Sequence, residues 1–76
     1  MWKHGQIKIN WLYIDYQAKV YPEPSRFGIN QGRISKLSLR VENEEVYWFD
    51  RGLDFDHLPD DIDINRVVNQ IEAIYV

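Results

Sequence analysis

Hydrophobic and polar residues alternate along most of the first half of the chain. Ile7 and Ile9 alternate with polar residues over positions 5–10, and every second residue is apolar over positions 13–21. A period of two is typical of a strand with one buried face. We therefore predict two strands, joined through Asn10-Trp11-Leu12 as a tight hairpin.

The same alternation returns after position 35. Residues 36–41 alternate again, residues 42–45 form a polar turn, and residues 46–49 are apolar on both sides. These features predict a third and a fourth strand. Ile34 breaks the parity of its strand, which predicts a bulge or a late strand start near Ser35.

The pattern changes to a helical one after Pro59. Asp60, Asp61 and Asp63 are suited to an N-cap and to the positive end of a helix. Helical spacing then runs over the last thirteen residues, and we expect its core side to be formed by Val67, Val68, Ile71 and Ile74. The prediction is one small α+β domain over residues 1–76, with a four-stranded antiparallel sheet and one C-terminal helix packed on one face.

A long connection separates the second and third predicted strands. It contains two prolines, two glycines and an asparagine, and it is longer than a hairpin requires. Gly28 and Gly32 are expected to adopt backbone conformations closed to other residues, so that alanine would be destabilising at either position. Long connections often carry function.

Charge divides the chain into two parts. Residues 1–41 contain seven basic and two acidic side chains, whereas residues 42–76 contain two basic and ten acidic ones. The simplest interpretation is that basic strands lie beside an acidic helix, and the alternative is that the asymmetry guides a partner. The chain has no cysteine, no apolar run long enough to span a membrane and no signal-peptide pattern at its start, so we expect a soluble cytoplasmic protein.

Several segments together resemble a known group of proteins. These are 16–20, Glu23-Pro24-Ser25, 27–29, 32–37 and 50–54, all within residues 2–56. Their order resembles a family of short uncharacterised proteins, a domain of unknown function, found in Gram-positive bacteria, their phages and mobile elements. The resemblance implies a small α+β domain and a mobile-element origin, but no activity. This chain differs in having Trp11-Leu12 where relatives have a glycine-containing turn, and in having Leu53 after Arg-Gly where relatives have an aromatic residue.

The residues that could carry chemistry do not form a recognisable catalytic or metal motif. Asp54 and Asp56 begin like a calcium loop, but Pro59 stands where that loop requires glycine and Asn65 where it requires glutamate. His4 and His57 have no cysteine partners, and no serine lies in a nucleophile elbow. We expect no enzyme, no metal and no cofactor.

Two kinds of binding remain. The favoured one is a protein-binding module, with an exposed aromatic and arginine surface at the hairpin tip and the long connection, formed by Trp11, Leu12, Arg26, Phe27, Ile29 and Arg33. A small inhibitor or modulator of a host system would fit the mobile-element resemblance, with the acidic half occupying a basic site. Phe27 and Ile29 could instead pack under the connection, and the tip could fold back over the core or associate with a second copy.

The alternative is a single-stranded nucleic-acid binder that uses the sheet face opposite the core. Its residues are Lys8, Tyr13, Lys19, Tyr21, Lys36 and Arg40. Cationic sheets with exposed aromatics hold single strands in several small folds. The overall acidity counts against this alternative, because a nucleic-acid-binding domain is usually basic.

Overall fold

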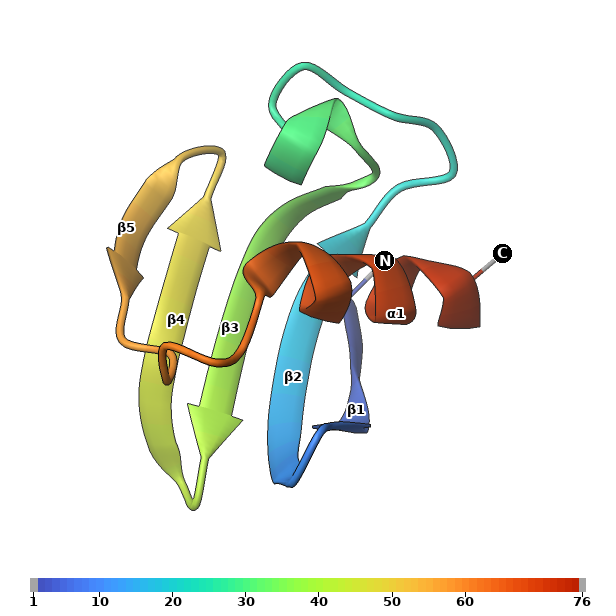
Figure 1. The fold of residues 1–76 in the computed structure, drawn as a ribbon. Helices are drawn as coiled ribbons and strands as arrows, with labels where there is room; N and C mark the ends of the chain where they lie inside the picture. Colours follow the sequence, from blue (N-terminus) through green and yellow to red (C-terminus); the bar gives the residue numbers. More distant parts are fainter. Residues whose placement is uncertain (1, 76) are drawn as a thin grey trace.

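The computed structural model describes residues 2–75 and consists of one sheet crossed by one helix (Figure 1). No helix in this range is long and apolar enough to cross a bilayer. The elements, in chain order, are β1 (Trp2–Ile9), β2 (Leu12–Val20), the short 3₁₀ helix η1 (Ile29–Gln31), β3 (Ile34–Val41), β4 (Glu44–Asp50), β5 (Leu53–Asp56) and α1 (Ile64–Ile74).

The sheet has five strands, so the prediction of four was wrong. All neighbours are antiparallel and the spatial order β1-β2-β3-β4-β5 follows the sequence. The extra strand, β5, pairs with the outer side of β4 through Tyr47–Asp56 and Trp48–Phe55. It was missed because four residues that include two aspartates give a weak strand signal, and the strand exists only through its pairing with β4.

The register explains the irregular parity near Ser35. Lys19 pairs with Lys36 and Val20 pairs with Ile34, so Ser35 is the extra residue of a bulge. The bulge keeps Ile34 fully buried although it lies out of step with Leu37. The predicted irregularity at this point is confirmed.

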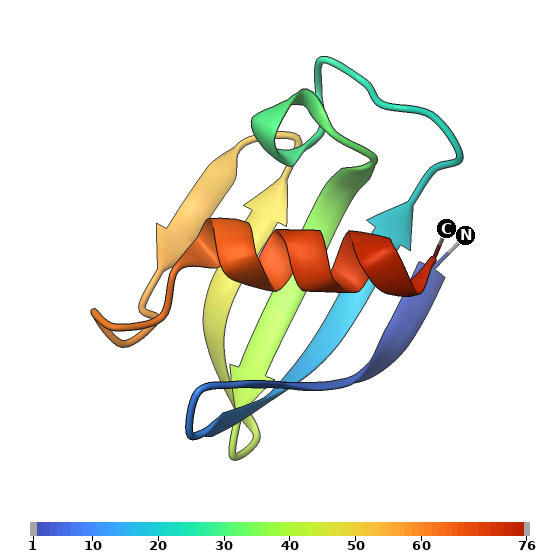
Figure 2. The ribbon, with the colours of Figure 1, turned by 45° about the vertical axis from the view of Figure 1, so that its right-hand side comes forward.

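Helix α1 covers one face of the sheet and completes the core (Figure 2). Asp63 is its N-cap, and the carboxylate of this residue accepts a hydrogen bond from the backbone N–H of Asn65 at 2.9 Å. Val67, Val68 and Ile71 are buried as predicted. Ile74 is 52% exposed, so its assignment to the core was wrong. The last turn instead contributes Tyr75, whose hydroxyl group hydrogen-bonds the Tyr16 hydroxyl.

The glycines of the long connection serve close approach rather than an unusual backbone angle. The prediction that Gly28 or Gly32 needs a conformation closed to other residues was wrong, because Gly28 has φ −79° and Gly32 has φ −99°. The left-handed positions are Asn30 and Gln31 in η1. A Cβ on Gly28, however, would lie 2.1 Å from the carbonyl oxygen of Gly32. Gly28 is therefore required by backbone contact.

We expect Gly28→Ala to lower the free energy of unfolding by about 2 kcal/mol or more, because backbone atoms must move to admit the methyl group. Gly52→Ala is the matched control. Nothing lies within 4 Å of a Cβ at Gly52, and its φ is not positive, so this change should be neutral or slightly stabilising. Urea unfolding monitored by circular dichroism measures both. Equal stability of the two variants would contradict the packing of the connection.

Two tyrosine hydroxyl groups belong to the buried part of the structure. Burial raises the pKa of Tyr47 to about 12, and the Asp56 carboxylate adds to this effect. Burial, followed by the hydrogen bond to Tyr75, raises the pKa of Tyr16 to about 12. Both groups therefore keep their protons in the folded chain at a pH where an unfolded tyrosine, with a pKa of 10.0, has lost its proton.

These shifts predict loss of stability in alkali. Below pH 10 the two tyrosines are protonated in both the folded and the unfolded chain, and their contribution to the free energy of unfolding is fully present. Between pH 10 and about pH 12 only the unfolded chain releases these protons, so unfolding becomes more favourable. Tyr47→Phe should flatten the fall in unfolding free energy over this range. Denaturant unfolding at a series of pH values measures the slope. An identical slope in Tyr47→Phe and wild type would contradict the assignment.

Candidate functional site

The two apolar residues of the predicted hairpin tip, Trp11 and Leu12, have different environments at the β1–β2 turn. The turn consists of Asn10, which has φ 55°, and Trp11. Leu12 is the first residue of β2 and is 8% exposed, whereas Trp11 is 62% exposed. Leu12 therefore belongs to the core and cannot serve as an exposed contact. Trp11 alone remains at the surface of the tip.

The exposed indole of Trp11 is nevertheless held in place. Its Nε1–H donates to the Asp61 carboxylate at 2.9 Å, and Arg66 donates to the Asn10 side-chain oxygen, also at 2.9 Å. These bonds join the hairpin tip to the 57–63 connection and to the first turn of α1. The ring is thus oriented by its bond to Asp61, the bond from Arg66 holds the neighbouring Asn10, and most of the surface of the ring faces solvent. One edge of the ring is therefore fixed against the helix entry and the rest is exposed, and an interface at the tip stays a prediction.

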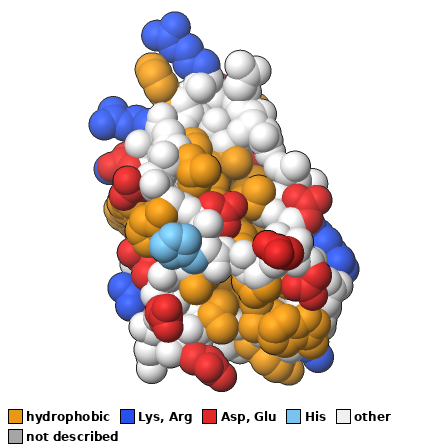
Figure 3. All heavy atoms as spheres, turned by 60° about the vertical axis from the view of Figure 1, so that its left-hand side comes forward, with side chains coloured by type: hydrophobic (Ala, Val, Ile, Leu, Met, Phe, Trp, Pro, Cys, Tyr) orange, Lys and Arg blue, Asp and Glu red, His pale blue; other side chains and the backbone are white. Residues whose placement is uncertain are grey.

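The surface between β5 and the start of α1 is acidic. Figure 3 shows acidic side chains spread over the side of the molecule that carries β5, with hydrophobic side chains between them. Asp56 and Asp63 each accept a hydrogen bond from a nearby backbone N–H. Within residues 2–75, Asp54 and Asp60 have neither an ion pair nor a side-chain hydrogen bond. Their charges are available to a partner.

The two oppositely charged parts of the sequence do not neutralise each other. Among the described residues the ion pairs all involve Asp50, which lies 3.7 Å from Lys36 and 3.6 Å from Arg51. The spatial order of the strands is the same as their order in the sequence, so the basic residues of the first half lie on the β1–β3 side of the sheet. Most acidic residues of the second half lie in β4, in β5 and in the connection from β5 to α1. The interpretation of basic strands balanced by an acidic helix therefore explains little of the asymmetry.

The sheet face away from α1, here called the open face, carries the predicted nucleic-acid residues. Lys8 and Tyr13 face each other across β1 and β2, and Lys19 and Lys36 across β2 and β3. The Lys8 ammonium lies 5.3 Å from the centre of the Tyr13 ring, and that of Lys19 lies 5.8 Å from the centre of the Tyr21 ring. The basic and aromatic groups are thus paired with each other by cation–π contacts.

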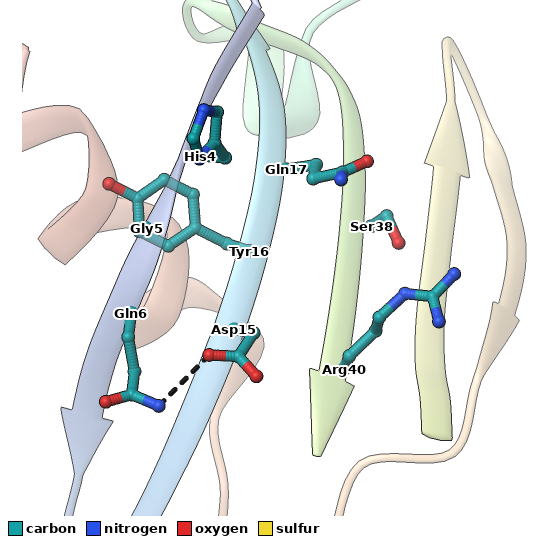
Figure 4. Close-up of a pocket in the computed structure, with 8 residues that line it drawn as sticks. All are labelled: His4, Gly5, Gln6, Asp15, Tyr16, Gln17, Ser38 and Arg40. Atoms are coloured by element: carbon teal, nitrogen blue, oxygen red, sulfur yellow. Dashed lines mark hydrogen bonds between the residues drawn. The ribbon is translucent and has the colours of Figure 1, made fainter. Parts of the chain in front are cut away.

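A shallow hollow of about 500 Å³ lies on the open face, across β1, β2 and β3 (Figure 4). Its side chains are mainly polar. Gln6 donates to Asp15 at 3.0 Å, and Asp15 stands opposite Arg40 in the register. Ser38, also in the lining, donates to Glu45 at 2.6 Å. Carboxylates therefore interrupt the basic groups of this face, which weakens it as a path for a phosphate backbone.

The remaining predicted contact residues lie at the opposite end of the sheet from Trp11 (Figure 1). Arg26 and Phe27 are exposed, and the guanidinium stacks 5.0 Å from the centre of the ring. Ile29 is only 6% exposed and packs in the core, so it is unavailable as a contact. The six residues proposed for protein binding therefore do not form one surface.

Arg33 has a structural task at the end of α1. Its guanidinium donates to the backbone carbonyls of Glu72 and Tyr75, both at 2.7 Å. The Glu72 carboxylate in turn accepts the backbone N–H of Arg33 at 3.1 Å. A cation that binds the last carbonyls of a helix also complements its dipole. Arg33 is therefore committed to fixing the helix rather than free to bind a partner.

The structure adds Asp61 and Arg66 to the residues around Trp11. From the sequence, Asp61 is expected only as an anion near the start of the helix, and Arg66 has no expected role. No local pattern could have found them, because 50 and 56 positions separate the bonded residues. Across residues 2–75, no three His, Asp or Glu side chains are grouped so that they could hold a metal ion.

Comparison with known proteins gives one match. Residues 1–75 match the model of a family described as a domain of unknown function (DUF7678). No curated protein and no solved structure matches the chain.

Proposed function

The chain belongs to the DUF7678 family of domains of unknown function, and we propose that it is a small protein-binding module whose contact surface is centred on Trp11. The observation that carries this proposal is the state of the Trp11 side chain, which is 62% exposed and yet fixed by its hydrogen bond to Asp61. An aromatic ring that is already oriented loses little conformational entropy on binding. Tryptophan is also among the residues most enriched at the energetic centres of interfaces.

The charges around Trp11 suggest the chemistry of the partner. Asp60, next to the Asp61 that bonds the indole, is exposed and has neither an ion pair nor a side-chain hydrogen bond within residues 2–75. A partner with an apolar recess and a basic group beside it would match this surface. The finer proposal is a modulator of a host system, acting in the cytoplasm by occupying a basic site, and the resemblance to short proteins of Gram-positive bacteria, phages and mobile elements supports it. In this role the protein is not an enzyme.

The test compares Trp11→Ala with Trp2→Ala. Both residues are exposed tryptophans, but Trp2 lies at the start of β1, at the other end of that strand. Each variant and the wild type would be immobilised, exposed to lysate of the native host, and their captured proteins quantified by mass spectrometry. We expect a partner that wild type and Trp2→Ala retain equally and that Trp11→Ala loses.

Circular dichroism must show that both variants are folded. Equal capture by Trp11→Ala and wild type would contradict the proposed surface. If sedimentation shows that wild type is a dimer and that Trp11→Ala is a monomer, the partner is a second copy of the chain.

A second candidate is single-stranded nucleic-acid binding by the open face. The observation in its favour is the pairing of Lys8 with Tyr13 and of Lys19 with Tyr21, because bases stack on such aromatic groups beside cations. The carboxylates of Asp15 and Asp50 on or beside the same rows count against it.

Fluorescence anisotropy with a labelled single-stranded oligonucleotide separates the two candidates. We expect weak binding that disappears as salt is raised to the physiological range, because few phosphates can be neutralised at once. A complex that persists at that salt, and that is lost in Lys19→Gln or Arg40→Gln but kept in Arg26→Gln on the distant connection, would reverse the ranking.

A further inference from the structure

The two edges of the sheet differ in length and in regularity. β1 is eight residues long and pairs only with β2, whereas β5, at the other edge, has four residues. The pairing of β1 with β2 has no register shift, whereas each of the other three pairings has one. β1 contains no proline, and residues 2–6 are exposed. This edge is therefore geometrically able to accept another strand.

Proteins usually protect such an edge by shape or by charge. β1 has no bulge and no proline, so its protection comes from Lys3 and Lys8, and the strand has no acidic residue. Neither lysine forms an ion pair within residues 2–75. Lysines on an edge repel a strand of the same charge, but they attract a strand that carries carboxylates. The two lysines therefore disfavour the addition of a basic strand at this edge and favour the addition of an acidic one.

The two lysines lie on opposite faces of the sheet. Lys3 is five residues before Lys8, and an odd separation in a strand reverses the side-chain direction. The contacts agree: the Lys3 ammonium lies 5.4 Å from the Tyr75 ring at the end of α1, and that of Lys8 lies 5.3 Å from the Tyr13 ring on the open face. Residues opposite both lysines on an added strand must therefore also be five apart.

We propose that the β1 edge binds an extended segment of a partner protein that carries two acidic residues five positions apart. The backbone of the segment would extend the sheet beyond β1, and its two carboxylates would pair with Lys3 and Lys8 on opposite faces. The backbone hydrogen bonds would form with any extended chain. The two cross-strand ion pairs would make the edge selective for a segment with acidic residues five positions apart. The surface is separate from the contacts of Trp11 and does not depend on them.

A second copy of this chain fits the edge poorly. β1 of another copy has no acidic residue, so in a β1–β1 pair neither Lys3 nor Lys8 would meet a carboxylate. β5 of another copy carries Asp54 and Asp56, but these are two positions apart and would meet only one of the two lysines. Charge complementarity therefore favours a different protein over self-association.

The test uses two synthetic eight-residue peptides of alternating threonine and valine, capped at both ends and equal in charge. One carries glutamate at its second and seventh positions, and the other at its second and sixth. We expect the first to bind about fivefold more tightly, because the second can form only one of the two ion pairs. We also expect it to slow hydrogen exchange of the β1 backbone amides. Equal affinity, or protection of amides elsewhere than in β1, would overturn the proposal.

Charge reversal provides the matched control. Lys8→Glu should lose the preference for the first peptide and should prefer a peptide with lysine at its second position, which faces residue 8 in an antiparallel pairing. Lys36→Glu, on an inner strand, should behave as wild type. Trp11→Ala should bind the first peptide normally, so a failure of the Trp11 surface and a failure of the edge can be distinguished. Dimerisation of the wild type that is abolished by Lys8→Glu would overturn the choice of partner.

Discussion

Burial of three side chains of α1 against one face of the sheet is the interaction on which the rest of the structure depends. Val67, Val68 and Ile71 are almost fully buried, and without them the sheet would have no covered face. One helix of eleven residues cannot cover both faces of five strands. The open face, the long β1 edge and the acidic surface near β5 all follow from this limited cover. The surfaces proposed above for partner binding lie among them.

Polar contacts then fix the direction of the helix across the sheet. At its start, the hairpin tip is joined to it through the bond from Arg66 to Asn10, and to the preceding connection through the bond from Trp11 to Asp61. At its end, the long connection supplies Arg33, which binds the last carbonyls. Both loops that the sequence marked as functional thus contact the helix or its entry. At the tip, Trp11 makes its contact while 62% of its surface stays exposed, whereas Arg33 of the long connection makes its contacts partly buried.

The sequence predicted those parts of the fold in which periodicity reports burial. The four longer strands and the helix follow from alternation and helical spacing, and the bulge at Ser35 from a break in parity. Leu12 also continues the alternation of β2, so its burial could have been inferred. The short β5 could not, because pairing rather than composition makes it a strand. The role of Arg33 and the orientation of Trp11 depend on contacts between distant segments, which no local pattern reports.

The central claim is that Trp11 is an exposed and oriented contact residue rather than part of the core. The most direct measurement is the free energy of unfolding of Trp11→Ala in urea, with Ile71→Ala as the reference for a core position. The account predicts a loss below about 1 kcal/mol for Trp11→Ala, the size of one exposed hydrogen bond, against about 2–5 kcal/mol for Ile71→Ala. A loss of about 3 kcal/mol or more for Trp11→Ala would show that the indole is needed for folding, and would contradict the account.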